Sequence, residues 1–248
     1  MNKQARAAET QAITATGSRN DAEIERKANE IDKAIEQLAN DGLGVRIHAI
    51  YKLKRISENN SYFHWTIMEI LTAFLQEKWS YSNEKLTTDA KERHDPFPPD
   101  KNAVLTVLGS RPDIEQRKDV DEDRFLNLRY LDLSHSGIDE RILNRADISN
   151  TNLKGAFLNK TSLKESYFIN SILDNAKFIG ADLTGAHLED SSCIGTDFKN
   201  SNVLDASFIG ANLNNANFSG AKNLTEKQIR EAKSAENIVL PEKMENNF

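Results

Sequence analysis

Residues 176–200 read AKFIG ADLTG AHLED SSCIG TDFKN, which is five consecutive blocks of five residues. The same period runs from residue 126 to residue 220, and the third residue of all nineteen blocks is apolar. The first residue is Ala, Ser or Thr in every block from Ala146 to Ala216. An α-helix repeats every 3.6 residues and a strand every two, so neither explains a period of five. One large and one small inward residue per block, often followed by Gly or Asn, indicates a short extended segment and a turn that repeat as a solenoid.

The blocks ADLTG, residues 181–185, and ANLNN, residues 211–215, resemble the pentapeptide-repeat family. The resemblance covers residues 126–220 and implies a right-handed quadrilateral β-helix with four blocks in each square coil. These 95 residues, at 20 to a coil, make about 4.75 coils. At the ~4.8 Å spacing of stacked strands the predicted rod is about 23 Å long.

Third-position residues that lie 20 apart should stack as four columns inside this rod. The predicted columns are Leu128, Ile148, Phe168, Leu188 and Phe208; Leu133, Leu153, Leu173, Cys193 and Leu213; Ile138, Leu158, Phe178, Phe198 and Phe218; and Leu143, Leu163, Leu183 and Val203. Phe178, Phe198 and Phe218 should therefore be stacked neighbours. Large or charged residues stand at three first positions of the first coil, so that coil is expected to be distorted or to form a junction. These residues are Leu126, Leu131 and Arg141.

The period breaks after residue 220, and we expect a capping helix over residues 221–235. Thr225 and Gln228 have the spacing of a capping box. A solenoid also needs its open end covered. Residues 236–248 are expected to form a polar tail.

Residues 21–112 show helical spacing and predict a small α-helical bundle, so that the fold class is α+β by segments. We expect helices at about 21–38, 45–57, 62–79 after Ser61 as N-cap, and 100–108. Residues 1–20 are expected to be disordered, 82–98 to be a loop and 113–125 a charged linker. The segment VRIHAIYKLKRIS, residues 45–57, resembles the helices of HEAT-like repeats. The arrangement is similar to the helical region before the repeats in some bacterial pentapeptide-repeat proteins.

Composition excludes several classes of protein. The chain has 32 basic and 38 acidic residues, a net charge of −6 and a mean hydropathy of −0.60. No segment predicts a membrane span or a secretory signal, so a cytoplasmic location is expected. One cysteine forms no internal disulfide and no Cys-rich zinc site. The acidic excess is spread evenly, which argues against direct binding to nucleic acid.

Motifs that carry chemistry are absent from the sequence, so we predict no enzyme activity and no catalytic, cofactor-binding or metal-binding residues. It has no P-loop, no G-x-G-x-x-G, no H-E-x-x-H and no G-x-S-x-G, and no two histidines lie four residues apart. Cys193 stands at an interior third position, which favours a buried and inert thiol. His187 faces outward and could meet a partner, although a solvated role is favoured. Asp182 and Asp197 stand at the polar second position and are interpreted as surface groups.

Three functions are compatible with this pattern. The favoured hypothesis is a non-catalytic protein-interaction or scaffold protein, in which the rod and the helical bundle dock a protein partner or a second copy of the chain. The resemblance also permits a DNA mimic, because some pentapeptide-repeat proteins protect DNA gyrase with a rod that resembles a DNA duplex. The rod has 11 acidic and 8 basic residues, which is a weak excess for a mimic. A regulatory or effector module is the second alternative.

The candidate protein interface consists of apolar residues at outward positions of the rod. The second, fourth and fifth positions of each block should face water, and five apolar residues at such positions lie on adjacent faces. They are Tyr167, Ile169, Ile172, Ile194 and Ile209. A contiguous apolar group of this size would indicate an interface. Two alternatives stay open: the helical bundle or the tail near residues 238–240 could cover the group, or it could reflect strand propensity alone.

Overall fold

The computed structural model describes residues 3–81, 98–110 and 125–244, with side chains described from residue 21 onward. The expected loop at 82–98 and the charged linker at 113–125 lie almost entirely outside these residues. The chain divides into two compact units, Met1–Ile67 and Met68–Phe248. This division falls inside the third helix, whereas the sequence predicted a single bundle over residues 21–112.

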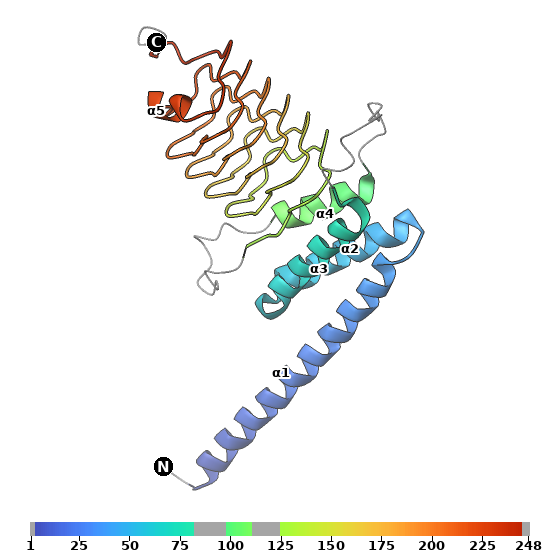
Figure 1. The fold of residues 1–248 in the computed structure, drawn as a ribbon. Coiled ribbons are helices and arrows are strands. Elements are labelled where there is room, and N and C mark those ends of the chain that lie inside the picture. The colour runs from blue at the N-terminus through green and yellow to red at the C-terminus, as the bar shows by residue number, and fades with distance from the viewer. Residues whose placement is uncertain (1–2, 82–97, 111–124, 245–248) are drawn as a thin grey trace. The chain divides into compact units, whose positions relative to one another are not determined.

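The first unit contains helix α1, Lys3–Leu38, and helix α2, Leu43–Asn59, which contact each other (Figure 1). Their buried apolar side chains are Ile31, Ala34 and Leu38 of α1 and Ala49, Ile50, Leu53 and Ile56 of α2. The turn between them is held by Arg46, whose Nη1 donates to the carbonyls of Asn40 and Asp41 at 3.0 and 2.8 Å. Helix α2 confirms the helix predicted over residues 45–57.

Helix α1 begins at Lys3, whereas disorder was expected over residues 1–20. Residues 3–16 include five alanines, and alanine has the highest intrinsic helix propensity. The expected disorder is therefore wrong from Lys3 onward, and helix propensity favours the helix in this segment.

Helix α3 spans Ser61–Trp79, and its N-cap is Asn60 and not the predicted Ser61. The backbone N–H of Tyr62 donates to Oδ1 of Asn60 at 3.0 Å, which is the hydrogen bond that an N-cap side chain makes. Helix α4 spans Pro99–Gly109 and agrees with the predicted helix at 100–108.

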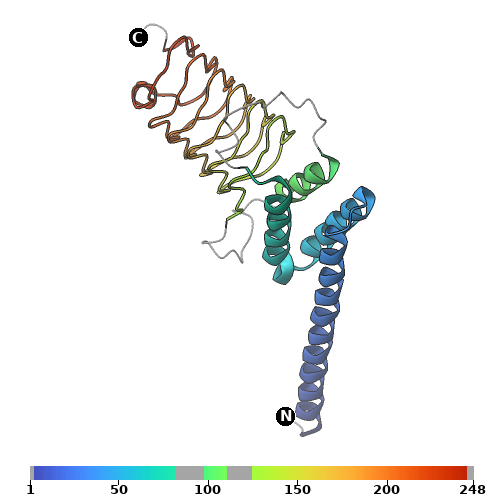
Figure 2. The ribbon, with the colours of Figure 1, turned by 45° about the vertical axis from the view of Figure 1, so that its right-hand side comes forward.

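The repeats form a stack of square coils, which Figures 1 and 2 show from two directions. In each of the first sixteen blocks the second residue pairs in parallel with the residue 20 positions later, as in the series Asn127, Asp147, Tyr167, His187 and Ser207. We number the four faces by their first blocks: face 1 begins at residue 126, face 2 at 131, face 3 at 136 and face 4 at 141. Coils 1 to 5 begin at residues 126, 146, 166, 186 and 206. The fold is therefore the predicted quadrilateral β-helix.

The fifth position of each block turns the corner with a positive φ. Asn150 has a φ of 57° and Gly155 a φ of 66°. This left-handed region is open to Gly and is tolerated by Asn, which explains the preference of the repeat for these residues. At Gly155 a Cβ would lie 2.7 Å from Nδ1 of His135, one coil earlier, so a larger residue would have to displace that ring.

All nineteen third-position side chains are buried, which confirms the four predicted columns. The rings of Phe178 and Phe198 stack at 5.4 Å between centroids and those of Phe198 and Phe218 at 4.8 Å. Phe208 of face 1 meets Phe198 edge-on at 5.8 Å. Coils 3 to 5 therefore share a continuous aromatic core.

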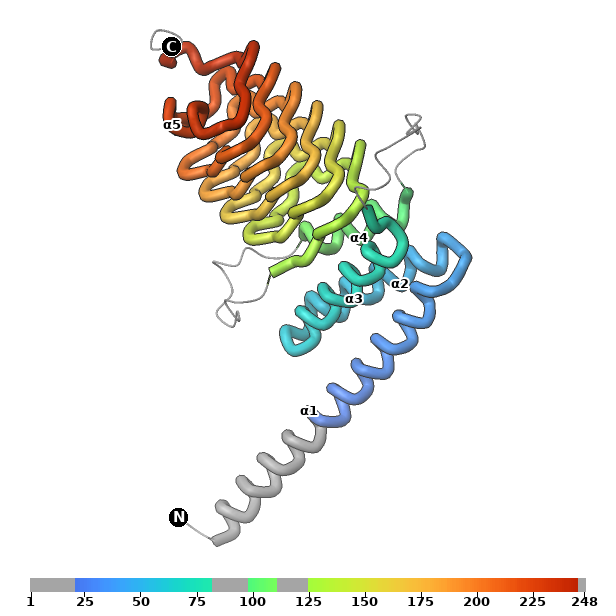
Figure 3. The backbone as a smooth tube through the Cα atoms, viewed as in Figure 1, coloured from blue at the N-terminus to red at the C-terminus, as the bar shows by residue number. Residues whose placement is uncertain are grey.

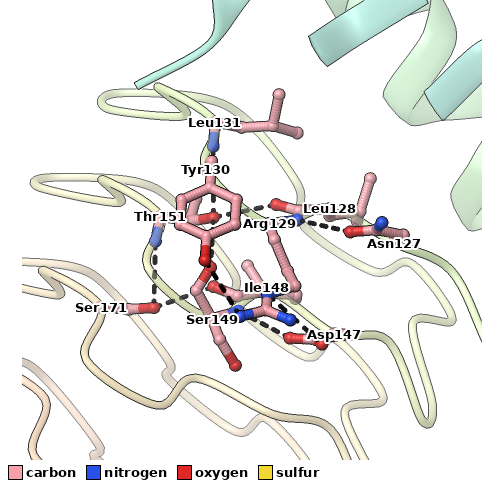
Figure 4. A network of polar contacts seen from close by, with 10 residues as sticks. All are labelled: Asn127, Leu128, Arg129, Tyr130, Leu131, Asp147, Ile148, Ser149, Thr151 and Ser171. Atoms are coloured by element: carbon pink, nitrogen blue, oxygen red, sulfur yellow. Dashed lines mark hydrogen bonds and ion pairs between the residues drawn. The ribbon is translucent and has the colours of Figure 1, made fainter. Parts of the chain in front are cut away.

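First-position hydroxyls bind main-chain carbonyls inside the rod (Figure 4). Thr151 Oγ1 donates to the carbonyl of Leu128 at 2.9 Å, and Ser171 Oγ donates to that of Ile148 at 2.8 Å. A buried hydroxyl without such a partner would cost about 1–3 kcal/mol. Ser and Thr fit this position because they are small and because the neighbouring coil supplies an acceptor.

The first coil is a junction with α4 and the end of α3 within the second unit. Ser80 forms an antiparallel bridge with Leu131, and the N–H of Asp132 donates to the carbonyl of Trp79 at 2.9 Å. Leu126 and Leu131 are buried there, which explains their size at first positions. Arg141, the third departure from the pattern, lies against Gly109 of α4, where a Cβ would be 2.7 Å from the Arg141 Cβ.

Lys101 of α4 is buried in this junction. Its Nζ donates to the carbonyl of Asp132 and lies 5.8 Å from the ring centroid of Trp79. Burial lowers the pKa of Lys101 to about 8, although the carboxylate of Asp132 acts in the opposite direction.

The C-terminal end of the rod carries the short helix α5, Glu226–Arg230 (Figure 3). The predicted capping box is present, since the N–H of Gln228 donates to Thr225 Oγ1 and the N–H of Thr225 donates to Gln228 Oε1. The helix is shorter than the predicted 221–235. Gln228 Nε2 also donates to the carbonyls of Val203 and Ala206, both at 2.8 Å.

The chain after α5 continues the ladder of the β-helix. The N–H of Leu213 donates to the carbonyl of Ser234, and the N–H of Phe218 donates to that of Val239, both at 2.7 Å. A polar tail was expected from residue 236, but coil 5 has main-chain groups that need partners. Residues 234–239 supply several of them.

Candidate protein interface

The β-helix directs the second and fourth residues of each block outward, on either side of the buried third residue. Residues 20 apart in sequence therefore form outward columns, spaced by about 4.8 Å per coil. The five predicted interface residues occupy such positions on faces 1 and 2 in coils 3 to 5. The structure places them on two adjacent faces of one rod.

Tyr167 and Ile169 flank the buried Phe168 on face 1 of coil 3. The Tyr167 side chain is 39% exposed, and Ile169 is half-buried. The Tyr167 ring stacks on the His187 ring of the next coil, with 4.7 Å between centroids and an interplanar angle of 3°. Nδ1 of His187 lies 3.1 Å from Oε1 of Glu189.

Ile172 and Ile194 lie on face 2. Ile172 is half-buried in the column of second positions, and Ile194 is 36% exposed in the column of fourth positions. The N–H of Ile194 donates to Oδ1 of Asp174, the fourth-position residue one coil earlier. This bond places a carboxylate next to the apolar side chain of Ile194.

Ile209 is 53% exposed on face 1 and lies two coils beyond Ile169. Glu189 stands between them in the same column. Two carboxylates therefore share the outward columns of the predicted residues: Asp174 stands in the column of Ile194, and Glu189 in that of Ile169 and Ile209. Sequence reasoning left out these two carboxylates and the stack of Tyr167 on His187, although writing the sequence in rows of 20 would have found them.

Exposed apolar side chains also occur on the other two faces. Phe157 of face 3 is 46% exposed and Leu204 of face 4 is 42% exposed. Exposure alone therefore does not single out faces 1 and 2. The tail does not cover Ile209, because Ser234 and Val239 pair with Asn212 and Asn217 at the end of the rod and Ile209 stays exposed.

The residues considered for chemistry have structural surroundings. Cys193 is completely buried, and burial raises the pKa of its thiol to about 12, which leaves it protonated and inert. Asp182 and Asp197 pair with Lys164 and Lys177 at 3.9 and 3.7 Å. Within the described residues, no three His, Cys, Asp or Glu side chains are grouped in a way that could hold a metal ion.

Comparison with known proteins identifies the repeat segment. The family model for pentapeptide repeats matches residues 142–178, 158–190 and 191–222, with eight copies of the repeat. These residues are pentapeptide repeats, and proteins of this family fold as right-handed quadrilateral β-helices. The chain therefore carries a pentapeptide-repeat domain, preceded by an N-terminal helical region. No curated protein matches the chain.

Solved structures similar to the chain include other pentapeptide-repeat proteins. One from the thylakoid lumen of Arabidopsis thaliana is 25% identical, with 40% of this chain and 72% of that chain covered and a TM-score of 0.38. Rfr23 from the cyanobacterium Cyanothece 51142 is 28% identical, with 41% of this chain and 65% of Rfr23 covered and a TM-score of 0.22. QnrB1, a plasmid-mediated fluoroquinolone resistance protein, is 13% identical, with 46% of this chain and 62% of QnrB1 covered and a TM-score of 0.25. The chain thus spans less than two thirds of the length of Rfr23 and QnrB1.

None of the helices in the described part of the chain combines the length and the apolar character that crossing a bilayer requires.

Proposed function

We propose that the chain is a non-catalytic protein-interaction or scaffold protein, which presents a rigid β-helical rod and an N-terminal helical docking domain to a protein partner. The observation that carries this proposal is the exposure of Tyr167, Ile194 and Ile209 at 39, 36 and 53%, on a rod whose third positions are all buried. Exposed apolar side chains that gather on one surface are expected at protein interfaces, and these three lie on the adjacent faces 1 and 2 of coils 3 to 5. Pentapeptide-repeat proteins are generally non-catalytic and mediate protein interactions, which supports the same function.

The ends of the rod support a role as a rigid presenting surface. At one end α4 contacts coil 1, because the N–H of Ile142 donates to the carbonyl of Gly109 at 3.0 Å. At the other end we assign α5 the role of a cap, on the basis of the two hydrogen bonds from Gln228 to coils 4 and 5. A solenoid with covered ends is available for binding through its sides. The cytoplasmic location stays a prediction.

The charges of the rod favour this function over a DNA mimic. Five of its carboxylates form ion pairs with basic residues of a neighbouring coil. The pairs are Arg129 with Asp147, Arg145 with Glu165, Lys160 with Glu140, Lys164 with Asp182 and Lys177 with Asp197. A mimic must present unneutralised negative charge to a DNA-binding surface. These pairs neutralise much of the acidic charge on the sides of the rod.

The proposal is tested by two matched double variants of the full chain. The patch variant, Tyr167→Ser with Ile209→Ser, removes one exposed aromatic and one exposed aliphatic side chain from face 1. The control variant, Phe157→Ser with Leu204→Ser, removes the same types from faces 3 and 4. Each protein is immobilised and used to capture partners from a lysate of the native host, and melting temperature and light-scattering mass are measured alongside.

We expect the patch variant to lose a captured protein that the control variant retains, at an unchanged melting temperature. A light-scattering mass that falls only in the patch variant would identify a second copy of the chain as the partner. Capture profiles that are identical for wild type and both variants would contradict the proposed surface.

A further inference from the structure

We propose that faces 1 and 2 of coils 3 to 5 dock a basic amphipathic helix of the protein partner. This inference rests on the proposed function and names the chemistry of the partner. The docking surface is defined by five apolar or aromatic residues and three carboxylates. Its members are Tyr167, Ile169, Ile172, Ile194, Ile209, Asp174, Glu189 and Asp190.

Charge is distributed unequally around coils 3 to 5. Residues 166–220 contain two basic residues, Lys177 and Lys199, and both lie on face 3. Faces 1 and 2 of these coils carry Asp174, Glu189 and Asp190 and no Lys or Arg. The docking surface is therefore acidic between its apolar side chains, and a basic partner complements it.

Basic residues also follow coil 5. Lys227 and Arg230 of α5 lie 3.6 and 2.9 Å from the carboxylates of Glu231 and Glu226. Lys233 is exposed at the end of face 2, where its N–H donates to the carbonyl of Ala211 at 2.9 Å. It lies beyond coil 5, whereas the carboxylates of the docking surface belong to coils 3 and 4.

Glu189 has an oxygen that a partner could satisfy. Its Oε1 contacts His187, but its Oε2 is buried without a hydrogen-bond donor among the described residues. The Glu189 side chain is 24% exposed, so its carboxylate lies near the surface of the rod. A guanidinium from a partner would supply the donors, and its flat face would fit beside the stacked rings of Tyr167 and His187.

The spacing of the column selects a helix as the bound segment. Ile169, Glu189 and Ile209 occupy one fourth-position column, so the two isoleucines are about 9.6 Å apart and Glu189 is midway. Residues seven apart on an α-helix are about 10.5 Å apart along its axis, with residues three and four between them on the same side. A helix along the rod can place two aliphatic residues over Ile169 and Ile209 and an arginine over Glu189.

A second copy of the chain is a poorer occupant for this surface. A two-fold contact would bring the same surface of both copies together. Asp174, Glu189 and Asp190 would then face identical carboxylates with no basic residue on either side, which is unfavourable.

The test uses the full chain and a labelled synthetic peptide as the probe. The peptide is a helix with two leucines seven residues apart, an arginine midway on the same side, and lysine and alanine elsewhere. Binding is measured by fluorescence anisotropy against wild type, Glu189→Gln and Ile209→Ser. The matched controls are Glu165→Gln and Leu204→Ser on face 4, which remove the same chemical groups from outside the docking surface.

We expect each change in the docking surface to weaken binding by about tenfold and each control change by less than about twofold. Replacing the peptide arginine by glutamine should weaken binding to wild type but not to Glu189→Gln. Equal weakening by docking-surface and control variants, or no binding of the peptide, would overturn the proposal. If the peptide does not bind while the Tyr167 and Ile209 double variant still loses a captured partner, the proposed function stands and the basic helix is wrong.

Discussion

Replacement of Phe198 by alanine tests the inward assignment of the third position. Phe198 is completely buried and its ring contacts three others, with centroid distances of 5.4 Å to Phe178, 5.8 Å to Phe208 and 4.8 Å to Phe218. Truncation removes the buried ring and leaves a cavity that the stacked coils cannot close. Substitutions of this kind cost about 3–5 kcal/mol, and the lost ring pairs place Phe198 in the upper part of that range.

The matched control is Phe157→Ala on the same face of the rod. Phe157 stands at an outward second position and is 46% exposed, so truncation removes about half of the burial of a phenylalanine and leaves no cavity. We expect a loss of about 1 kcal/mol. The two variants therefore differ by about 3 kcal/mol, or roughly a factor of 10² in the folded-to-unfolded ratio.

The assay is urea unfolding followed by far-ultraviolet circular dichroism, with hydrogen exchange to locate the effect. Each coil contacts only its neighbours, so Phe198→Ala should lower amide protection most in coils 3 to 5. Equal losses of stability in Phe198→Ala and Phe157→Ala would refute the assignment of inward and outward positions.

Three further predictions concern other parts of the second unit. Cys193 should not react with a thiol reagent at neutral pH in the folded protein, because burial raises its pKa to about 12. It should react fully in denaturant. Fast reaction in the native state would contradict its interior position. Lys101 should make stability rise between about pH 8 and pH 10.5. Its pKa is about 8 in the folded state and near the ordinary 10.5 in the unfolded state, so the unfolded state binds more protons in this window. Lys101→Met should remove that rise, as measured by urea unfolding at several pH values, and an identical pH profile for wild type and variant would contradict the prediction. A chain that starts at residue 126 should lose amide protection in coil 1 and keep it in coils 3 to 5, because the main-chain hydrogen bonds that α4 and the end of α3 make to the rod within the described residues go to coil 1. Full protection in coil 1 would show that the junction is dispensable.

The interior of the rod could be predicted from sequence because its period is strict. Each third position repeats the same environment, so counting in steps of 20 predicts that Phe178, Phe198 and Phe218 stack on one another. The departures at Leu126 and Leu131 also predict a junction at coil 1, but the segments that form it, α4 and the end of α3, occur only once and do not follow from the period.

The pairing of the chain after α5 with coil 5 was not predicted, because the register changes there. Asn212 pairs with Ser234, and Asn217 pairs with Val239, so each offset is 22 residues instead of 20. Helix α5 accounts for the change, since a helical segment replaces one block of face 1 and needs two more residues to return to the ladder. A search for a period of five cannot recognise a strand that has moved by two residues.

The apolar residues of the candidate interface were predicted from the sequence one by one. The charge of the surface around them depends on which residues share an outward column. Tyr167 and His187, or Ile169 and Glu189, are 20 residues apart in sequence and direct neighbours on the rod. A list of outward apolar residues omits the carboxylates that lie between them, and it is these carboxylates that favour a basic partner over a second copy. Because inward residues form the core and the proposed partner binds the outward columns, Phe198→Ala should destabilise the rod, whereas Ile209→Ser should weaken partner binding in a rod that stays folded. A variant of Ile209 that unfolds the rod would contradict this separation, and with it the assignment of faces 1 and 2 as a surface free to bind.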